Sequence, residues 1–256
     1  MIDTHTHLYY PDYGEAINDI LARAQELGVS HFVLPNVNEE SVAQVRDFHS
    51  RFPHVTSMAM GIHPTDVKDN WEEFIPIMEK ELSSGDYVAV GEVGIDLYWD
   101  KSTLPLQLEA FQRQLTIAMK YQLPVIIHCR EAIEETMEVI EKIRPNVPLI
   151  FHSFTGNSED IRRIRKGCDP FFGINGVVTY KNAPALRDAI KEIGLNKILL
   201  ETDAPYLTPV PHRGKRNDSS FLPFIRDKIA EVLELDPSII DKITDENAKA
   251  IFNISD

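Results

Sequence analysis

Two histidines stand two residues apart near the start of the chain. His5 and His7 are separated by Thr6 and follow the apolar Ile2. Residues i and i+2 of an extended strand project from the same face, so the two imidazole rings can converge on one point above that strand. Imidazole nitrogens are common ligands of divalent transition metals. The pair therefore indicates one wall of a metal site.

Other side chains able to bind a metal stand at or near the ends of short apolar runs further along the chain. They are Glu92, His128, His152 and Asp203. A single histidine at the end of a strand is most often structural, whereas six such side chains in one recurring position indicate a shared site. Six ligands are too many for one catalytic ion that keeps a position open, and they suit two ions that share a carboxylate. We place Glu92 between the two ions.

The remaining ligands divide between the two ions. His5, His7 and Asp203 are assigned to the first ion, and His128 and His152 to the second. A histidine-rich set with carboxylates suits transition metals better than a set of oxygen ligands alone. The sequence thus predicts two divalent ions per chain, with Mg²⁺, Mn²⁺ and Zn²⁺ as the candidates.

Repeated secondary structure must position these side chains. Eight short apolar segments, each followed by helical periodicity, are typical of repeated βα units around a parallel sheet. The expected strands are 2–7, 31–35, 55–62, 87–92, 124–128, 149–152, 171–174 and 197–202. The expected helices are 16–27, 41–52, 71–82, 106–121, 132–143, 160–165 and 185–193, then 221–233 and 244–252 after the last strand.

Eight units of this kind predict a (β/α)8 TIM barrel, class α/β, with residues 1–256 in one domain. An open doubly wound sheet is the alternative. In a barrel the carboxyl ends of the strands carry the active site, and all six proposed ligands fall at such ends. The long segment 205–223, which contains four prolines, follows the last strand on the same side. Long loops of this kind are often functional.

Composition limits the classes of function. With 26 basic and 40 acidic residues the net charge is −14, which argues against a broad nucleic-acid surface and leaves bound cations to attract an anionic substrate. Cys129 and Cys168 form no CxxC pair, so neither a disulfide framework nor a thiolate zinc site is expected. Neither a secretory signal nor an apolar run of the ~18 residues that span a membrane is recognised. A cytoplasmic protein without a membrane or an obligate protein partner is expected.

Six blocks of sequence resemble the signature blocks of the TatD family. They are 5–7, 61–64, 91–96, 127–130, 152–156 and 201–205. Members of that family are metal-dependent deoxyribonucleases with a (β/α)8 barrel, in the amidohydrolase-like superfamily. The resemblance implies exonucleolytic attack on DNA, most directly on single strands from the 3′ end, with single-stranded DNA or another nucleic acid as substrate. Asp218 and Ser219 depart from the family pattern, which has Glu and Pro there.

The chemical requirements of phosphodiester hydrolysis indicate roles for further residues. Two ions would lower the pKa of a water toward ~7, and Asp203 would orient that water and accept its proton. His63, before a rigid proline, is placed to contact the phosphate or to protonate the leaving group; the alternative is a structural histidine. Together with Glu92 these form the predicted catalytic set. Arg130 and Arg213 are predicted to bind phosphate. For each of them a salt bridge to a neighbouring carboxylate, such as Asp96 or Glu131, is an equally weighted alternative.

Further predictions concern residues next to the proposed ligands and aromatic residues at the rim. Glu201 stands two residues before Asp203 and is expected to orient a ligand histidine. Asp3, two residues before His5, either has the same role or lies deeper in the barrel. Rings that could stack on bases flank the blocks at the rim. These rings are Tyr98, Trp99, Phe154, Tyr180 and Tyr206.

Two other classes of function stay open. A hydrolase on the same barrel could cleave another ester or amide, such as a small-molecule or aminoacyl-tRNA ester. A metal-binding scaffold without turnover is disfavoured, because the ligand set leaves room for water and His63 is additional to it.

Overall fold

The computed structural model describes residues 1–255, in which eight parallel strands pair in chain order around a barrel. The strands are β1 (Ile2–Asp3), β2 (His31–Pro35), β3 (Thr56–Met60), β4 (Tyr87–Asp96), β5 (Val125–Arg130), β6 (Leu149–Phe151), β7 (Phe171–Ile174) and β8 (Ile198–Leu200). A doubly wound sheet would reverse its strand order at a switch point, which this sheet does not do. The predicted (β/α)8 barrel is confirmed, and the alternative prediction of an open doubly wound sheet is wrong.

The ring closes between β8 and β1, at the place where proposed ligands stand. Thr4 N donates to Leu200 O at 3.0 Å, and Asp203 N donates to His5 O at 2.9 Å. His7 N donates to Ala204 O at 2.8 Å. The backbones that carry His5, His7 and Asp203 are therefore joined directly to one another.

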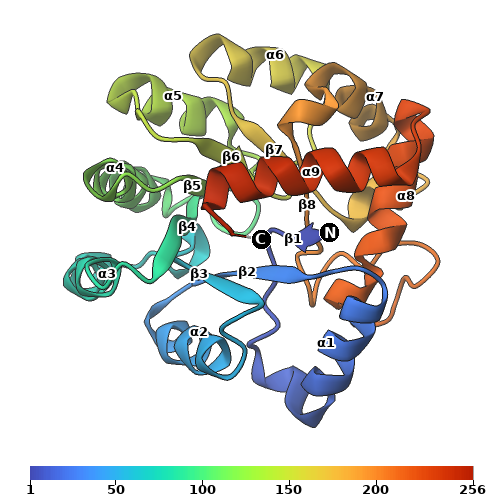
Figure 1. The fold of residues 1–256 in the computed structure, drawn as a ribbon. Helices are drawn as coiled ribbons and strands as arrows, with labels where there is room; N and C mark the ends of the chain where they lie inside the picture. Colours follow the sequence, from blue (N-terminus) through green and yellow to red (C-terminus); the bar gives the residue numbers. More distant parts are fainter. Residues whose placement is uncertain (256) are drawn as a thin grey trace.

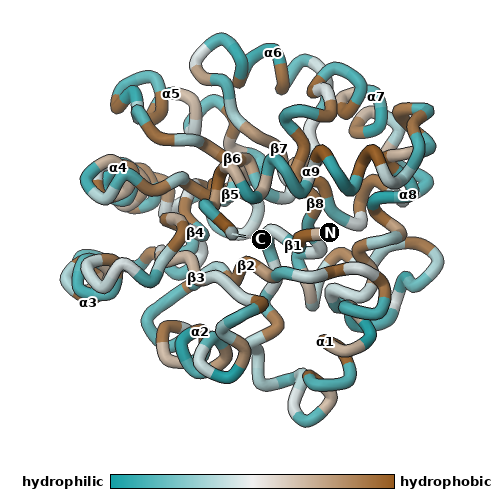
Figure 2. Tube along the Cα trace, viewed as in Figure 1, coloured by the Kyte–Doolittle hydropathy of each residue, from teal (hydrophilic) through white to brown (hydrophobic). Residues whose placement is uncertain are grey.

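Helices surround the barrel, with their apolar faces turned toward the strands (Figures 1 and 2). The helices are α1 (Ile17–Glu26), α2 (Glu39–Arg51), α3 (Phe74–Leu82), α4 (Leu104–Tyr121), α5 (Ile133–Ile143), α6 (Ser158–Gly167), α7 (Pro184–Ile193), α8 (Leu222–Leu233) and α9 (Pro237–Phe252). Within the described residues, no helix has both the length and the apolar character needed to cross a membrane.

Some predicted bounds differ from the observed ones for identifiable reasons. Helix α9 begins at Pro237 rather than at 244, because Asp236 caps it by accepting from Ser238 N. Helix α6 begins at Ser158 because the Asn157 side chain accepts from Glu159 N. Strand β4 extends past Glu92 to Asp96, and its pairing with β5 shifts register between Val90 and Val93.

One end of the barrel is filled by apolar side chains. A buried cluster inside the barrel contains Ile2, Val33, Ala59, Ala89, Ile126, Ile150 and Leu199, together with Ala248, Ile251 and Phe252 of α9. Helix α9 lies across this end of the barrel (Figure 1). The amino-terminal end is thus closed, and the carboxyl-terminal end is left for the site.

Candidate metal centre

The carboxylate of Glu92 lies in the middle of a group of histidines. Glu92 is 3% exposed, and its Oε2 lies 3.2 Å from His5 Nε2. Its other oxygen, Oε1, lies 2.8 Å from both His128 Nδ1 and His152 Nε2. The two oxygens of one carboxylate therefore face two sets of imidazole nitrogens, as a bridging position requires.

The first set gathers at the junction of β1 and β8. His7 Nε2 lies 3.9 Å from Glu92 Oε2, and Asp203 Oδ1 lies 3.9 Å from His5 Nε2 and 3.7 Å from His7 Nε2. Asp203 has a positive φ of 55°. The left-handed turn after β8 brings its carboxylate over the same point as the two rings.

The second set includes His63, for which the sequence predicts a contact with the phosphate or the leaving group rather than with a metal. His63 Nε2 lies 3.2 Å from Glu92 Oε1 and 3.2 Å from His128 Nδ1. Its Nδ1 lies 2.7 Å from Thr65 Oγ1, which holds the ring in place after β3. Ligand atoms of His63, Glu92 and His128 lie within 4.8 Å of one another. His63 thus lies beside the second set, slightly farther from Glu92 Oε1 than His128 and His152, which are both 2.8 Å away.

Two further carboxylates contact the far sides of the histidines. Asp96 Oδ2 lies 2.9 Å from His128 Nε2. Glu201 Oε1 lies 3.5 Å from His152 Nδ1 and accepts from Ser153 N at 2.5 Å. The sequence predicted Glu201 in this role but considered Asp96 only as a partner for Arg130. The available signal was the place of Asp96 at the end of the same block as Glu92.

Buried nitrogens without hydrogen bonds test whether these residues fit a metal. The rings of His5 and His152 stack with centroids 3.8 Å apart. Within residues 1–255, the ring nitrogens of His5 and His152 are buried and make no well-directed hydrogen bond, even where Nε2 lies close to an oxygen of Glu92. Buried polar atoms are normally paired. Unpaired imidazole nitrogens beside carboxylates are the donors that divalent transition metals take, so the residues fit a metal centre.

The charge states also suit metal binding. Burial acts to raise the pKa of Glu92, but His152, His63 and His5 outweigh it and hold that pKa well below its ordinary value. Burial lowers the pKa of His5 and of His63. Burial acts to lower the pKa of His128 and of His152 as well, but neighbouring carboxylates outweigh it and raise both. At neutral pH the site therefore presents an ionised Glu92 carboxylate and neutral rings at His5 and His63, while His128 and His152 hold a proton more tightly, which a bound metal ion would displace.

A hollow of about 580 Å³ opens above this group and is lined by His7, His63, Glu92, His128, His152 and Asp203. Arg130 lies in its wall, with the guanidinium 3.7 Å from the centroid of the Tyr98 ring. Arg213 does not line the hollow; its guanidinium lies 4.0 Å from the centroid of the Tyr180 ring. The structure thus places one predicted phosphate-binding arginine at the hollow and the other on a neighbouring loop.

The aromatic residues proposed for stacking divide in the same way. Trp99 and Tyr206 line the hollow and are 71% and 54% exposed. Phe154 is buried and packs edge-on against Phe172, so it is part of the core.

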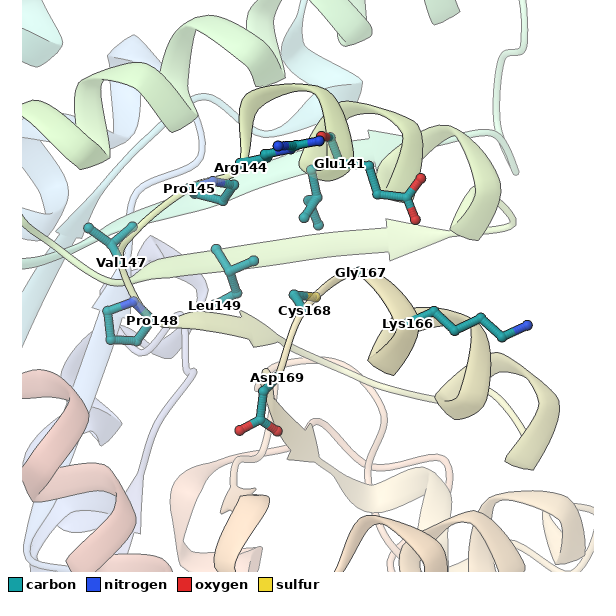
Figure 3. Close-up of a pocket in the computed structure, with 11 residues that line it drawn as sticks. Glu141, Arg144, Pro145, Val147, Pro148, Leu149, Lys166, Gly167, Cys168 and Asp169 are labelled. Atoms are coloured by element: carbon teal, nitrogen blue, oxygen red, sulfur yellow. The ribbon is translucent and has the colours of Figure 1, made fainter.

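A second hollow, of about 640 Å³, lies between α5 and α6 near the amino ends of β6 and β7 (Figure 3). Both carboxylates that line it are paired, since Glu141 contacts Arg163 at 2.6 Å and Asp169 contacts Lys197 at 2.7 Å. It lies away from the carboxyl ends of the strands. Two arginines of α6 likewise pair with neighbouring helices: Arg162 with Glu192 of α7, and Arg163 with Glu134 and Glu141 of α5.

A (β/α)8 barrel with histidines and carboxylates gathered at its carboxyl rim defines the class of metal-dependent hydrolases built on this fold. The model of the family described as TatD related DNase matches residues 2–253. The chain belongs to this family and is a metal-dependent hydrolase of the TatD family, as its sequence blocks predicted.

Relatives in sequence and in structure agree with this membership. The uncharacterized metal-dependent hydrolase YabD of Bacillus subtilis is 36% identical over 257 residues, covering 100% of both chains. The 3'-5' ssDNA/RNA exonuclease TatD of Salmonella typhimurium is 33% identical over 266 residues, covering 99% of each. The crystal structure of YJJV, a TatD homolog from Escherichia coli, is similar with a TM-score of 0.88 at 26% identity, covering 100% of this chain and 98% of that one.

Proposed function

We propose that the protein hydrolyses phosphodiester bonds of single-stranded nucleic acid, releasing nucleotides from the 3′ end with two divalent ions. The observation that carries the proposal is the position of Glu92, whose Oε2 faces His5 while its Oε1 faces His128 and His152. Relatives from Salmonella typhimurium and Escherichia fergusonii, each 33% identical, are named 3'-5' ssDNA/RNA exonuclease TatD, which supports this substrate class.

The donors divide into two ligand groups in the proposed centre. His5, His7 and Asp203 would hold the first ion, and His128 and His152 the second, with Glu92 shared. Ions bound there supply positive charge that lowers the pKa of an attacking water and neutralises the phosphoryl group. Mg²⁺, Mn²⁺ and Zn²⁺ are the proposed candidates.

Asp203 is the proposed base. Burial acts to raise its pKa, but the hydrogen bond with His7 and the charges of His152 and His5 outweigh it and lower that pKa. The carboxylate is therefore ionised at neutral pH and able to orient a water and accept its proton. Its side chain is 13% exposed, which leaves it accessible from the hollow.

His63 and Arg130 are the proposed contacts to the scissile phosphate. The lowered pKa of His63, caused first by burial, favours a neutral ring that donates a hydrogen bond over one that gives up a proton to the leaving group. Arg130 is held by its stack on Tyr98, so less freedom is lost when its planar donors bind a phosphate. The unpaired cysteines are consistent with the cytoplasm, which we keep as the proposed compartment.

End-labelled single-stranded oligonucleotides, incubated with Mg²⁺, Mn²⁺ or Zn²⁺, test the proposal. We expect mononucleotide release that stops with a chelator and falls at least 100-fold in Glu92→Gln, an order of magnitude typical for loss of a catalytic group. Glu40→Gln, at an exposed position of α2, is the matched control. A panel of amide, lactone and aminoacyl-ester substrates runs beside it. Intact oligonucleotides with every metal, or faster turnover of another substrate, would contradict the proposal.

A further inference from the structure

The loop after β8 is basic in a chain that is otherwise strongly acidic. Residues 204–217 contain Arg213, Lys215 and Arg216 and no Asp or Glu, whereas the whole chain has a net charge of −14. These three residues are exposed. We call them, together with Tyr180, the basic ledge. Such a local surface attracts polyanions despite the overall charge.

Contacts hold the basic ledge in one arrangement. The Arg213 guanidinium lies 4.0 Å from the centroid of the Tyr180 ring, and Tyr180 Oη donates to Thr208 O at 3.1 Å. Thr208 Oγ1 donates to Lys215 O at 2.6 Å. The Arg216 guanidinium lies 4.5 Å from the centroid of the Tyr13 ring. Charges that are already positioned lose less conformational entropy on binding than free side chains do.

The basic ledge continues from the wall of the hollow. Tyr206 and Leu207, which begin the same loop, line the hollow, as does Val177 of η4 (Gly176–Thr179). A Cβ added at Gly176 would lie 2.0 Å from Leu207 O, so η4 and the loop are in close contact. Tyr180 directly follows η4. A chain leaving the hollow over Val177 and Leu207 therefore meets the Arg213 and Tyr180 stack.

Carboxylates disfavour an alternative path for the strand, through a hollow that adjoins the central one. An adjoining hollow of about 600 Å³ shares Arg130, His152 and Thr155 with the central one. Its lining also contains the carboxylates of Glu131, Glu134, Glu135 and Asp160. Like charges repel a phosphate backbone in this direction. Glu134 is paired with Arg163, but this side of the rim still has more carboxylates than basic groups, in contrast to the basic ledge.

We propose that the single strand beyond the cleaved nucleotide runs over the basic ledge, with Arg213 and Lys215 bound to backbone phosphates remote from the scissile bond. The proposal rests on the proposed function, and it gives Arg213 a different phosphate from the one that Arg130 contacts. The exposed ring of Tyr206 and the planar guanidinium of Arg213 on Tyr180 can support bases without selecting a sequence. Binding by the basic ledge is thus specific for chain length rather than for base.

Kinetics on two lengths of substrate test the path of the strand. The wild type, Arg213→Ala/Lys215→Ala and Arg213→Lys are compared on a dinucleotide and on an oligonucleotide of roughly 12 nucleotides, long enough to cover a typical single-strand site. For the double variant we expect KM for the oligonucleotide to rise roughly tenfold, about the effect of one or two charged contacts. The kinetic constants for the dinucleotide stay unchanged. Arg213→Lys keeps the charge and recovers most of the loss.

Salt dependence gives a second, independent measurement. Binding of the labelled oligonucleotide to the metal-free wild type and variants is followed by fluorescence anisotropy. Each lost phosphate contact reduces the slope of log K against log salt by about 0.7. Lys101→Ala, at an exposed position in the loop after β4, is the matched control. Equal length preference and equal salt slope in the control and the double variant would overturn the inference. Absence of hydrolysis by the wild type contradicts the proposed function instead, while the anisotropy comparison still decides the path.

Discussion

The basicity and orientation of His128 depend on the carboxylate that contacts the far side of its ring. His128 contacts Glu92 through Nδ1 and Asp96 through Nε2, at 2.8 and 2.9 Å. A ligand histidine held from its far side keeps one tautomer and one orientation. Burial acts to lower the pKa of His128, but its bonds to Asp96 and Glu92 outweigh it and raise that pKa. Asp96 therefore makes the ring a better donor to a cation.

Asp96→Asn tests this contact. An amide cannot supply the negative charge that raises the basicity of His128. We therefore expect the affinity for the second ion, to which His128 is assigned, to fall about 10- to 100-fold. Elemental analysis after dialysis at limiting metal counts the ions that remain per chain. Asp100→Asn, at an exposed position in the next loop, is the control. Unchanged ion content in Asp96→Asn at every metal concentration would show that the contact is not used.

A histidine far from the metal centre contributes to the response to acid. Burial, with a smaller effect from His49, lowers the pKa of His31 to about 4, and its ring contacts Ser57 Oγ at 2.8 Å. The unfolded chain takes up this proton near its ordinary pKa of 6.5, before the folded one does. The contribution of His31 to stability is therefore complete above about pH 6.5 and is lost as the pH falls toward 4.

His31→Gln should remove this part of the acid sensitivity. We expect the free energy of unfolding to fall by roughly 1–2 kcal/mol less between pH 7 and pH 4.5 than it does in the wild type, allowing for partial solvent screening. Urea denaturation at the two pH values measures the difference. His54→Gln, at an exposed position, should keep the wild-type dependence. The same pH dependence in His31→Gln as in the wild type would be the contradicting result.

At the scale of elements, the loop after β8 shapes the site from outside. Asn217 is fully buried, and its Nδ2 donates to Thr202 O at 2.9 Å and to Tyr206 O at 2.6 Å. These carbonyls flank the turn in which Asp203 has a φ of 55°. Few residues other than glycine adopt this conformation without support. One amide thus holds the turn that aims Asp203.

Asn217→Ala should impair turnover more than substrate binding. With both hydrogen bonds lost the turn relaxes, and a shift of about 1 Å in a catalytic group can lower kcat roughly 100-fold. The dinucleotide is the substrate of choice, since it does not depend on the basic ledge, and its KM should change little. Asn182→Ala, at an exposed position before α7, is the control. A rise in KM at constant kcat would assign Asn217 to binding instead.

Hydrophobic periodicity predicts the strands and helices better than it predicts which side chains contact one another. Alternation of apolar strands and helices was enough for the barrel, and the carboxyl ends of the strands then brought His5, Glu92 and Asp203 to one rim. The contact between His63 and His128 joins residues 65 positions apart, and no periodicity reports such a distance. Helix α9 is longer than its apolar periodicity predicts, because Asp236 caps it and Pro237 occupies its first turn. The basic ledge depends on how the loop after β8 packs against Tyr180, and residue spacing along one loop cannot predict a contact between two loops.

At the scale of the whole molecule, stability and chemistry lie at opposite ends of the barrel. Phe252 of α9 is 1% exposed and packs with the apolar side chains inside the amino-terminal end. The proposed ligands lie at the carboxyl ends of the strands. Because the layers between them are closely packed, a cavity at the amino-terminal end changes the free energy of unfolding before it changes the position of a ligand.

Phe252→Ala should therefore separate the two properties. Loss of a buried ring costs about 3–5 kcal/mol of unfolding free energy, including the cavity that it leaves. Ile239→Ala on the same helix removes a side chain that is 40% exposed and should cost much less. Per folded molecule, kcat for the dinucleotide and the number of bound ions should equal those of the wild type, measured below the melting transition. A loss of ions in Phe252→Ala at such temperatures would mean that the two ends of the barrel are coupled through the strands.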